Sequence, residues 1–242
     1  MIHRIVLAAV LPLAVAAMPA FAQDAMKSGG MGAMGTMGAM GKADSGRLVA
    51  ITIENLTTGQ GFSPAFFATH GADAAPLFKL GEPASEALWN VAEAGNIGPF
   101  SGAAAGAIGT TYGAASLAIH TPPGASRTVY IKVDKDHPLL SGVFMLGMTN
   151  DGFSGVSSVD AYSLTGPMTV NALAYDAGSE KNNEKRGYLG ALGDGNMRDP
   201  ENGVVTRHTG IRGDADAPAA WKFDPAAPVA RITLAPVDHG AM

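Results

Sequence analysis

The chain contains no cysteine in its 242 residues. Disulfide bonds, thiolate zinc sites and cysteine nucleophiles are therefore excluded, and an ordinary hydrophobic core must stabilise the fold. Charged residues are also scarce, at 15% of the chain, and acidic side chains outnumber basic ones by 21 to 16. A basic surface for nucleic acid is lacking, so we expect no nucleic-acid partner. With 32 Gly and 15 Pro, the composition favours a turn-rich β protein.

The N-terminus has the features of a secretory signal peptide. Arg4 precedes an apolar run over residues 5–17, and the small-residue ending Ala20-Phe21-Ala22 follows. These features make residues 1–22 the predicted signal peptide and place the rest in the periplasm or outside the cell. The apolar run is too short to span a bilayer, and no later run approaches about 20 apolar residues. We therefore expect no transmembrane segment.

Residues 23–45 form a segment of low complexity, rich in Gly, Ala and Met. Its methionines recur at every third position, at Met31, Met34, Met37 and Met40. One interpretation is a flexible tether, because ordering so many glycines costs more free energy than the small apolar surface returns. The other is a Cu(I) site, since thioethers bind soft ions. Asp238, His239 and Met242 in the tail at 237–242 could add ligands to it.

After residue 46, apolar and polar residues alternate as they do in half-buried strands. The clearest case is Arg47–Glu54. Seven similar segments follow, at Ala65–His70, Ser116–His120, Arg127–Asp134, Gly142–Met148, Met168–Tyr175, Val204–His208 and Val229–Ala235. Glu82–Ala94 instead has the spacing of a short helix, and Ser101–Ala115 has the composition of a loop. We predict an all-β antiparallel sandwich of eight strands and one short helix, in one domain over residues 46–236.

Two segments in the second half place carboxylates among Gly, Asn and Ser at the ends of predicted strands. They are residues 149–155, which include Asp151, and residues 175–184, which include Asp176 and Glu180. If the strand ends lie side by side, the three carboxylates meet, and a cation such as Ca²⁺ would relieve their repulsion. Asn-Asp-Gly and Asp-Ala-Gly are also ordinary turn sequences. Spacing alone therefore leaves a metal site and a pair of turns open.

Other polar residues have simpler interpretations. Glu184 is a possible further ligand, although we expect it on the solvated face. The loop at 193–199 has calcium-ligand residue types without EF-hand spacing, and we interpret it as a turn. Asn55-Leu56-Thr57 matches the N-glycosylation acceptor pattern. His70 and His208 each end an apolar strand, a position typical of structural, hydrogen-bonded histidines.

The sequence has no recognisable catalytic constellation. The serine-hydrolase pattern Gly-x-Ser-x-Gly and the zinc motif His-Glu-x-x-His do not occur, and the six histidines are scattered. Glu180 and Glu184 could form a glycosidase pair, but aromatic residues that would hold a sugar ring make up only 7% of the chain. We therefore expect a non-enzymatic protein.

Several motifs resemble the spondin N-terminal domain family. In consistent order over residues 46–236, they are Ile53–Pro64, Ala68–His70, Gly81–Glu86, Met148–Gly155, Tyr175–Glu180, His208–Ile211 and Pro228–Thr233. The resemblance implies a C2-like antiparallel β-sandwich that binds one calcium ion through Asp151, Asp176 and Glu180. It also implies a binding or adhesion module for an extracellular or cell-surface ligand, protein or polysaccharide. A predicted signal peptide followed by a single domain is similar to the stand-alone bacterial members.

Overall fold

The computed structural model describes residues 46–101, 111–117, 119–195, 197–213 and 215–237, which belong to one compact unit. The predicted signal peptide, the methionine-rich segment at 23–45 and residues 238–242 of the predicted tail lie outside the described residues. The predictions of export and of a Cu(I) site in that segment therefore stay predictions. Within the described ranges, no helix is long and apolar enough to cross a membrane.

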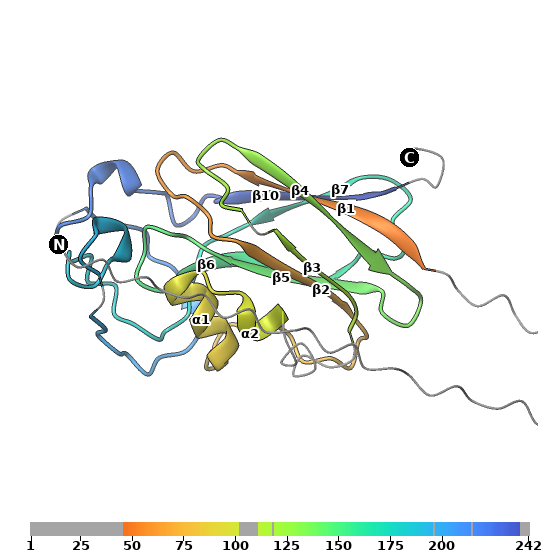
Figure 1. Ribbon diagram of the computed structural model, residues 1–242, viewed down its shortest axis with the longest axis horizontal. Coiled ribbons are helices and arrows are strands. Elements are labelled where there is room, and N and C mark those ends of the chain that lie inside the picture. The colour runs from red at the N-terminus through yellow and green to blue at the C-terminus, as the bar shows by residue number, and fades with distance from the viewer. Residues whose placement is uncertain (1–45, 102–110, 118, 196, 214, 238–242) are drawn as a thin grey trace, which may run out of the picture. The chain divides into compact units, whose positions relative to one another are not determined.

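The described residues form two antiparallel sheets that face each other (Figure 1). The first sheet has the order β4-β1-β10-β7, formed by β4 (Ser126–Val133), β1 (Arg47–Asn55), β10 (Ala230–Pro236) and β7 (Met168–Ala172). The second has the order β3-β2-β5-β6-β8-β9, formed by β3 (Thr111–Leu117), β2 (Ala65–His70), β5 (Leu139–Met145), β6 (Gly152–Asp160), β8 (Tyr175–Asp176) and β9 (Thr206–Arg207). The predicted all-β antiparallel sandwich is confirmed.

The main core lies between the two sheets. Along β1, Val49, Ile51 and Ile53 are fully buried, while the residues between them are partly exposed. They belong to one apolar cluster with Phe67 of β2 and Phe144 of β5, which come from the opposite sheet. Burying a side chain of this size contributes about 1.5–3 kcal/mol. The period-two pattern of the sequence therefore marks the inner face of the sandwich.

A second apolar cluster covers the other face of the six-stranded sheet. The helices α1 (Glu86–Ala94) and α2 (Gly98–Ser101) lie on this face in Figure 1. Leu88 and Val91 of α1 pack in one cluster with Phe66 of β2 and Phe153 of β6. Because both of its faces are covered, every residue of β2 is buried. The sheet that carries the candidate site is thus held rigidly from both sides.

Several predicted boundaries are wrong. Part of the predicted loop Ser101–Ala115 is the strand β3. The predicted helix Glu82–Ala94 ends at the expected residue but begins only after Ser85. The predicted strand Met168–Tyr175 is divided into β7 and β8. The largest error is β6, which the sequence pattern does not predict as a strand. Its sequence GFSGVSSVD lacks apolar alternation because glycine is needed there: a Cβ on Gly155 would lie 2.0 Å from the carbonyl oxygen of Gly142 on β5.

His70 has the structural role predicted for it. Its Nδ1 lies 2.8 Å from the carbonyl oxygen of Gly71, and its Nε2 lies 2.8 Å from Oγ of Ser141. Because a carbonyl oxygen only accepts, Nδ1 carries the hydrogen, and Nε2 of the neutral ring accepts the Ser141 hydroxyl. Both residues are buried, so this Ser–His pair joins β2 to β5 and is closed to a substrate.

Asn55 is also structural, although its sequence matches a glycosylation site. Its Nδ2 donates to the carbonyl oxygens of Gln60 at 2.6 Å and Thr121 at 3.0 Å. Its Oδ1 accepts the backbone N–H of Thr57 at 3.0 Å and the Thr57 hydroxyl at 2.7 Å. Asn55 is buried, so Nδ2 in the folded chain is both inaccessible and already bonded.

Replacing Asn55 by Ala is expected to lower the free energy of unfolding by about 2 kcal/mol, since several buried hydrogen bonds are lost while the carbonyl acceptors keep other donors. Urea denaturation of the two proteins measures the difference. Asn171→Ala, at an exposed position of β7, is the control and should change stability by less than about 0.5 kcal/mol. A loss for Asn55→Ala no larger than that of the control would contradict the structural role.

Candidate metal site

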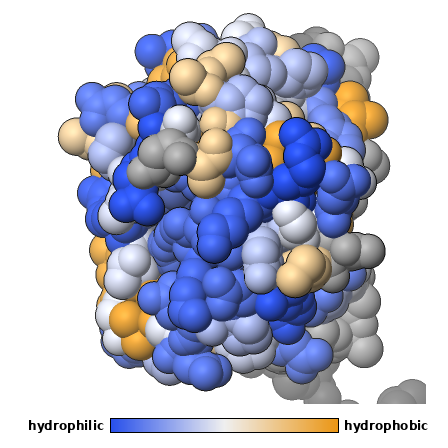
Figure 2. Space-filling model, turned by 90° about the vertical axis from the view of Figure 1, so that its left-hand side faces the viewer, coloured by the Kyte–Doolittle hydropathy of each residue, from blue (hydrophilic) through white to orange (hydrophobic). Residues whose placement is uncertain are grey.

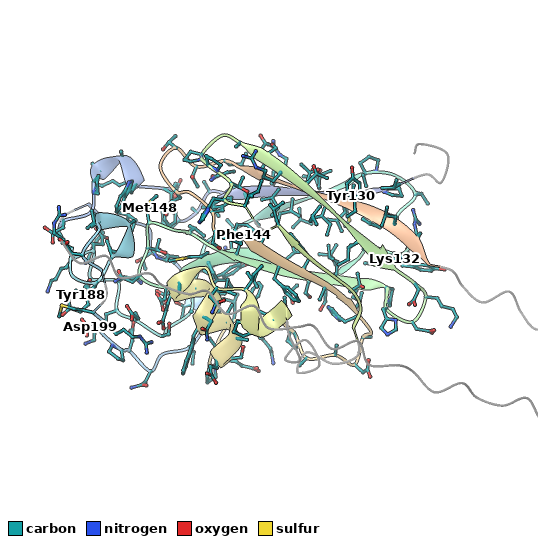
Figure 3. All side chains as sticks on the ribbon, in the orientation of Figure 1. Tyr130, Lys132, Phe144, Met148, Tyr188 and Asp199 are labelled. Carbon is teal, nitrogen blue, oxygen red and sulfur yellow. The ribbon has the colours of Figure 1, made fainter. Side chains whose placement is uncertain are left out.

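The two segments with predicted site carboxylates meet at one end of the sandwich. Asp151 directly precedes β6, Asp176 ends β8, and these strands pair with Gly152 opposite Asp176. The two strand ends therefore lie side by side. Figure 3 labels Met148, Tyr188 and Asp199 at this end. Figure 2 views the same end, whose surface is mainly hydrophilic.

Asp151 is the most deeply buried carboxylate of the site, with 0% of its surface exposed. Its Oδ2 accepts three hydrogen bonds, from the backbone N–H of Ser179 at 2.8 Å, the Ser179 hydroxyl at 3.2 Å and the backbone N–H of Glu180 at 3.0 Å. Its Oδ1 is buried and has no hydrogen-bond partner among the described residues. One side of this carboxylate is therefore satisfied and the other is not.

Burial raises the pKa of Asp151 from 3.8 to about 7, and the nearby carboxylate of Asp176 adds to the rise. The hydrogen bonds from Glu180 and Ser179 oppose it, but they do not compensate. An ionised Asp151 is thus unfavourable without a further positive charge. A divalent cation at Oδ1 would supply that charge and return the pKa toward its ordinary range.

Asp176 is held by the turn that follows it. Its Oδ1 accepts the backbone N–H of Gly178 at 2.7 Å, and its Oδ2 accepts the side-chain amide of Asn182. Gly178 has a φ of 68°, in the left-handed region, and a Cβ there would lie 2.7 Å from backbone atoms of Val204. Glycine is therefore required at position 178 by the turn conformation and by the close packing on Val204. The turn directs the backbone N–H groups of residues 179 and 180 toward Asp151.

Glu180 is nearly buried, but its side chain pairs with Arg198. Nε of Arg198 donates to Oε1 of Glu180 at 2.9 Å, and Nη2 of Arg198 donates to Glu93 of α1 at 2.6 Å. Burial raises the pKa of Glu180, while the hydrogen bond from Arg198 lowers it. Among the described residues, no three His, Asp or Glu side chains are grouped so as to hold a metal. The sharing of one ion by Asp151, Asp176 and Glu180 therefore stays a prediction.

Glu184 does not lie on a solvated face, so that expectation is wrong. It is 2% exposed, and its two carboxylate oxygens accept the backbone N–H groups of Arg212 at 2.6 Å and Gly213 at 2.8 Å. Two N–H donors compensate for the burial of the charge. Glu184 thus fixes the loop at 212–213 to the site segment, and its oxygens are occupied by the backbone.

His208 packs against Gly152, the residue that follows Asp151. Its Nδ1 accepts the backbone N–H of Gly210 at 2.9 Å, so the hydrogen of the neutral ring is on Nε2, which has no partner among the described residues. Burial lowers its pKa, although the charges of Asp176 and Glu184 oppose this. The ring fills the space over Gly152, where a Cβ would lie 2.9 Å from its Cδ2. The predicted structural, hydrogen-bonded role is confirmed.

The residues present are of the types that calcium prefers. Two buried side-chain oxygens that have no hydrogen-bond partner in the described part of the chain, Oδ1 of Asp151 and Oδ1 of Asn150, belong to adjacent residues. Calcium takes oxygen ligands from carboxylates, amides and carbonyls. Asp151 and Asn150 offer these oxygens without the loss of a hydrogen bond, whereas Asp176 and Oε1 of Glu180 already accept hydrogen bonds. The site thus fits a hard cation, because its side-chain atoms with no hydrogen-bond partner among the described residues include these two oxygens.

A pocket of about 460 Å³ adjoins these residues. Its wall includes Thr149, Asn150 and Glu180 of the site, and Tyr188, Met197 and Arg198 from the following loop. Pockets of this size accommodate small ligands or one group of a larger ligand. Any change at the candidate site therefore also changes a recessed surface that a ligand can reach.

Sequence reasoning missed three residues that organise the site: Ser179, Asn182 and Arg198. Ser179 and Asn182 lie within the predicted segment, where their capacity to donate hydrogen bonds to the carboxylates is a usable signal. Arg198 comes from the loop at 193–199, whose sequence indicates only a turn. Its position depends on a backbone pairing of Glu180 with Pro200, which the local sequence does not indicate.

Comparison with known proteins identifies the family of the chain. Curated protein sequences give no match to the chain. The Spondin_N family model matches residues 55–184, more than half of the chain. The match includes β2, β5, β6 and β8, and it ends at Glu184, after both site segments. This family is a non-enzymatic domain type and, at family level, a binding module of the extracellular type. The chain belongs to the spondin N-terminal domain family.

Proposed function

We propose that this chain is an exported, non-enzymatic binding module that holds one calcium ion at the end of its β-sandwich. The observation that carries the proposal is Asp151. Its carboxylate is fully buried near that of Asp176, and one of its oxygens has no hydrogen-bond partner within the described ranges. A protein gains little stability from such a group on its own, because burying an uncompensated charge is costly. A bound cation would compensate the buried charge of Asp151.

The role of the ion in this proposal is to fix the segments 149–155 and 175–184 against each other. Both contribute to the pocket described above, through Thr149, Asn150 and Glu180. The ligand we propose is an extracellular or cell-surface protein or polysaccharide, and the compartment is the periplasm or the exterior of the cell. The Cu(I) alternative depends on residues 23–45 and stays a prediction, which deletion of that segment and a Cu(I) affinity measurement test.

Calcium is expected to stabilise the protein against heat. At a free concentration 100 times its dissociation constant, the gain is about 2.7 kcal/mol, equivalent to roughly 5–10 °C in Tm for a domain of this size. Differential scanning calorimetry at pH 7.5 in calcium and in chelator measures it, together with metal analysis of the purified protein. Mg²⁺ at equal concentration should give a smaller shift, because its rigid octahedral shell suits such a loop site less well.

The matched variants are Asp151→Asn and Asp194→Asn. Asp194 lies in the loop at the same end and its side chain is 66% exposed, so its loss should leave the calcium response intact. Asp151→Asn should remove most of it. An equal response of both variants, or a wild-type Tm that calcium does not change, would mean that Asp151 holds no calcium.

A further inference from the structure

Arg198 connects three separate parts of the chain at the edge of the pocket. Its Nε bonds to Glu180, and its Nη2 bonds to Glu93 in the last turn of α1. The backbone fixes this position, because Glu180 and Pro200 form an antiparallel bridge and the N–H of Lys181 donates to the carbonyl oxygen of Asp199 at 2.9 Å. We call the Glu93, Arg198 and Glu180 contacts the Arg198 bridge.

Both carboxylates of the bridge need a positive partner. The side chain of Glu180 is 5% exposed, so its charge is poorly solvated. Glu93 lies at the C-terminal end of α1, where the helix dipole disfavours an anion and where no basic residue of the helix itself lies in the last turn. The Arg198 side chain is 55% exposed. Arg198 therefore neutralises two carboxylates, and its exposed side chain can move into the solvent.

The bridge also explains why Glu180 stands apart from the other site carboxylates. Oε1 of Glu180 accepts the hydrogen bond from Arg198, and no third carboxylate joins Asp151 and Asp176 among the described residues. A cation that takes Oε1 of Glu180 competes with the guanidinium for that oxygen. Charge-assisted hydrogen bonds of this kind are among the stronger ones in proteins. The cost of breaking this one is subtracted from the affinity for the ion.

We propose that Arg198 is an internal counter-ion that holds Glu180 until calcium displaces it. The proposal rests on the proposed calcium site. When the ion binds, Glu180 leaves Arg198, the Arg198 bridge loses its link between the site segment and α1, and the pocket wall formed by Glu93, Glu180 and Arg198 rearranges. The bridge thus sets the calcium affinity of the site and couples its occupancy to the shape of the pocket.

Calcium titration of three purified proteins by isothermal calorimetry tests this. Arg198→Met keeps the apolar part of the side chain and removes the charge. We expect it to bind calcium about tenfold more tightly than wild type, since no charge-assisted bond must be broken. Lys181→Met is the matched control. Lys181 follows Glu180 directly, is similarly exposed at 58% and pairs with Asp199, at 2.9 Å. Its replacement should change the affinity by less than about twofold.

The two variants separate a specific bridge from a general effect of charge. Equal tightening by both variants, or no tightening by Arg198→Met, would overturn the role of Arg198 while leaving calcium binding by wild type intact. If neither wild type nor Arg198→Met binds calcium, the proposed function and the inference fail together. Binding by Arg198→Met alone would support the bridge and contradict calcium binding by the natural chain.

A second measurement needs no stable variant. The ¹⁵N NMR signal of the Arg198 Nε–H group reports its hydrogen bond to Glu180, and its exchange with water is slow while the bond is present. Calcium addition should shift this signal and accelerate its exchange, whereas the other arginine side chains, Arg231 with its exposed partner Glu54 for example, should not respond. An Arg198 signal that calcium leaves unchanged would overturn the displacement.

Discussion

Asp151→Asn is expected to stabilise the calcium-free protein at pH 8 by up to about 4 kcal/mol, although it removes a buried, hydrogen-bonded side chain. The asparagine keeps one oxygen to accept the N–H groups of Ser179 and Glu180, which Oδ2 accepts in the natural chain. Its amide takes the position of Oδ1, which has no donor among the described residues. The substitution therefore removes the charge, and the buried amide N–H groups that it introduces keep the gain below that upper value.

The sign of the effect follows from the direction of the pKa shift. The pKa of Asp151 is about 7 in the folded chain and 3.8 when unperturbed. Below pH 4 the carboxyl is protonated in both states and adds no penalty. As the pH rises toward 7, the unfolded chain loses this proton first, so the stability of the folded state falls by up to about 1.4 kcal/mol per pH unit. Above pH 7 the deficit is constant.

Urea denaturation in chelator at pH 5, 6, 7 and 8 measures this pH dependence. The stability of Asp151→Asn minus that of wild type should grow with pH and level off above pH 7. Asp194→Asn, at an exposed carboxylate, should show a constant difference from wild type. Calcium at 100 times its dissociation constant should reduce the difference at pH 8 by about 2.7 kcal/mol, because only wild type gains from the ion. A difference that does not change with pH would contradict the raised pKa.

Gly178→Ala is expected to destabilise the protein by about 3–4 kcal/mol, because left-handed backbone geometry costs an L residue about 1–2 kcal/mol and a backbone clash adds about 2 kcal/mol. The new Cβ would lie 2.7 Å from both the nitrogen and the oxygen of Val204. Relief of that contact must move the turn. The turn carries the N–H donors of Ser179 and Glu180, so we also expect weaker calcium binding.

Gly81→Ala is a control for the backbone geometry alone. Gly81 has a φ of 81°, and no atom of the residues that the structure describes lies within 4 Å of the position that a Cβ would take there. Its replacement should therefore cost only about 1–2 kcal/mol and leave calcium binding unchanged. Urea denaturation and calcium titration of both variants make the comparison. Equal losses for the two glycines would mean that the close packing of Gly178 on Val204 has no energetic effect.

Local sequence pattern identified the strands that have one buried face. β1 and β4 begin and end within a residue of the prediction, because a strand with one face in the core must alternate apolar and polar residues. The pattern did not identify β6, because apolar and polar residues do not alternate along it. It lies between β5 and β8, its first five residues are all buried, and its glycines permit close approach of the neighbouring backbone.

The same distinction applies to the candidate site. Asp151 and Asp176 are predictable neighbours because each adjoins a strand end, and antiparallel pairing of β6 with β8 brings those ends together. The partners of Glu180 and Glu184 are not predictable in this way. Glu184 is buried by backbone N–H groups of residues 212 and 213, and Glu180 is bound by Arg198, all of them distant in the sequence.

The sequence by itself determined the all-β class, the family, and the two short segments in which a cation site can form. These depend on alternation and on runs of adjacent residues, which are local properties of the chain. Only the tertiary structure decided which carboxylates are buried, which are neutralised and by what. Asp151 is left with an oxygen that has no partner among the described residues, and Glu180 is paired with Arg198. Charge compensation depends on distances between residues brought together by folding, so no local pattern records it.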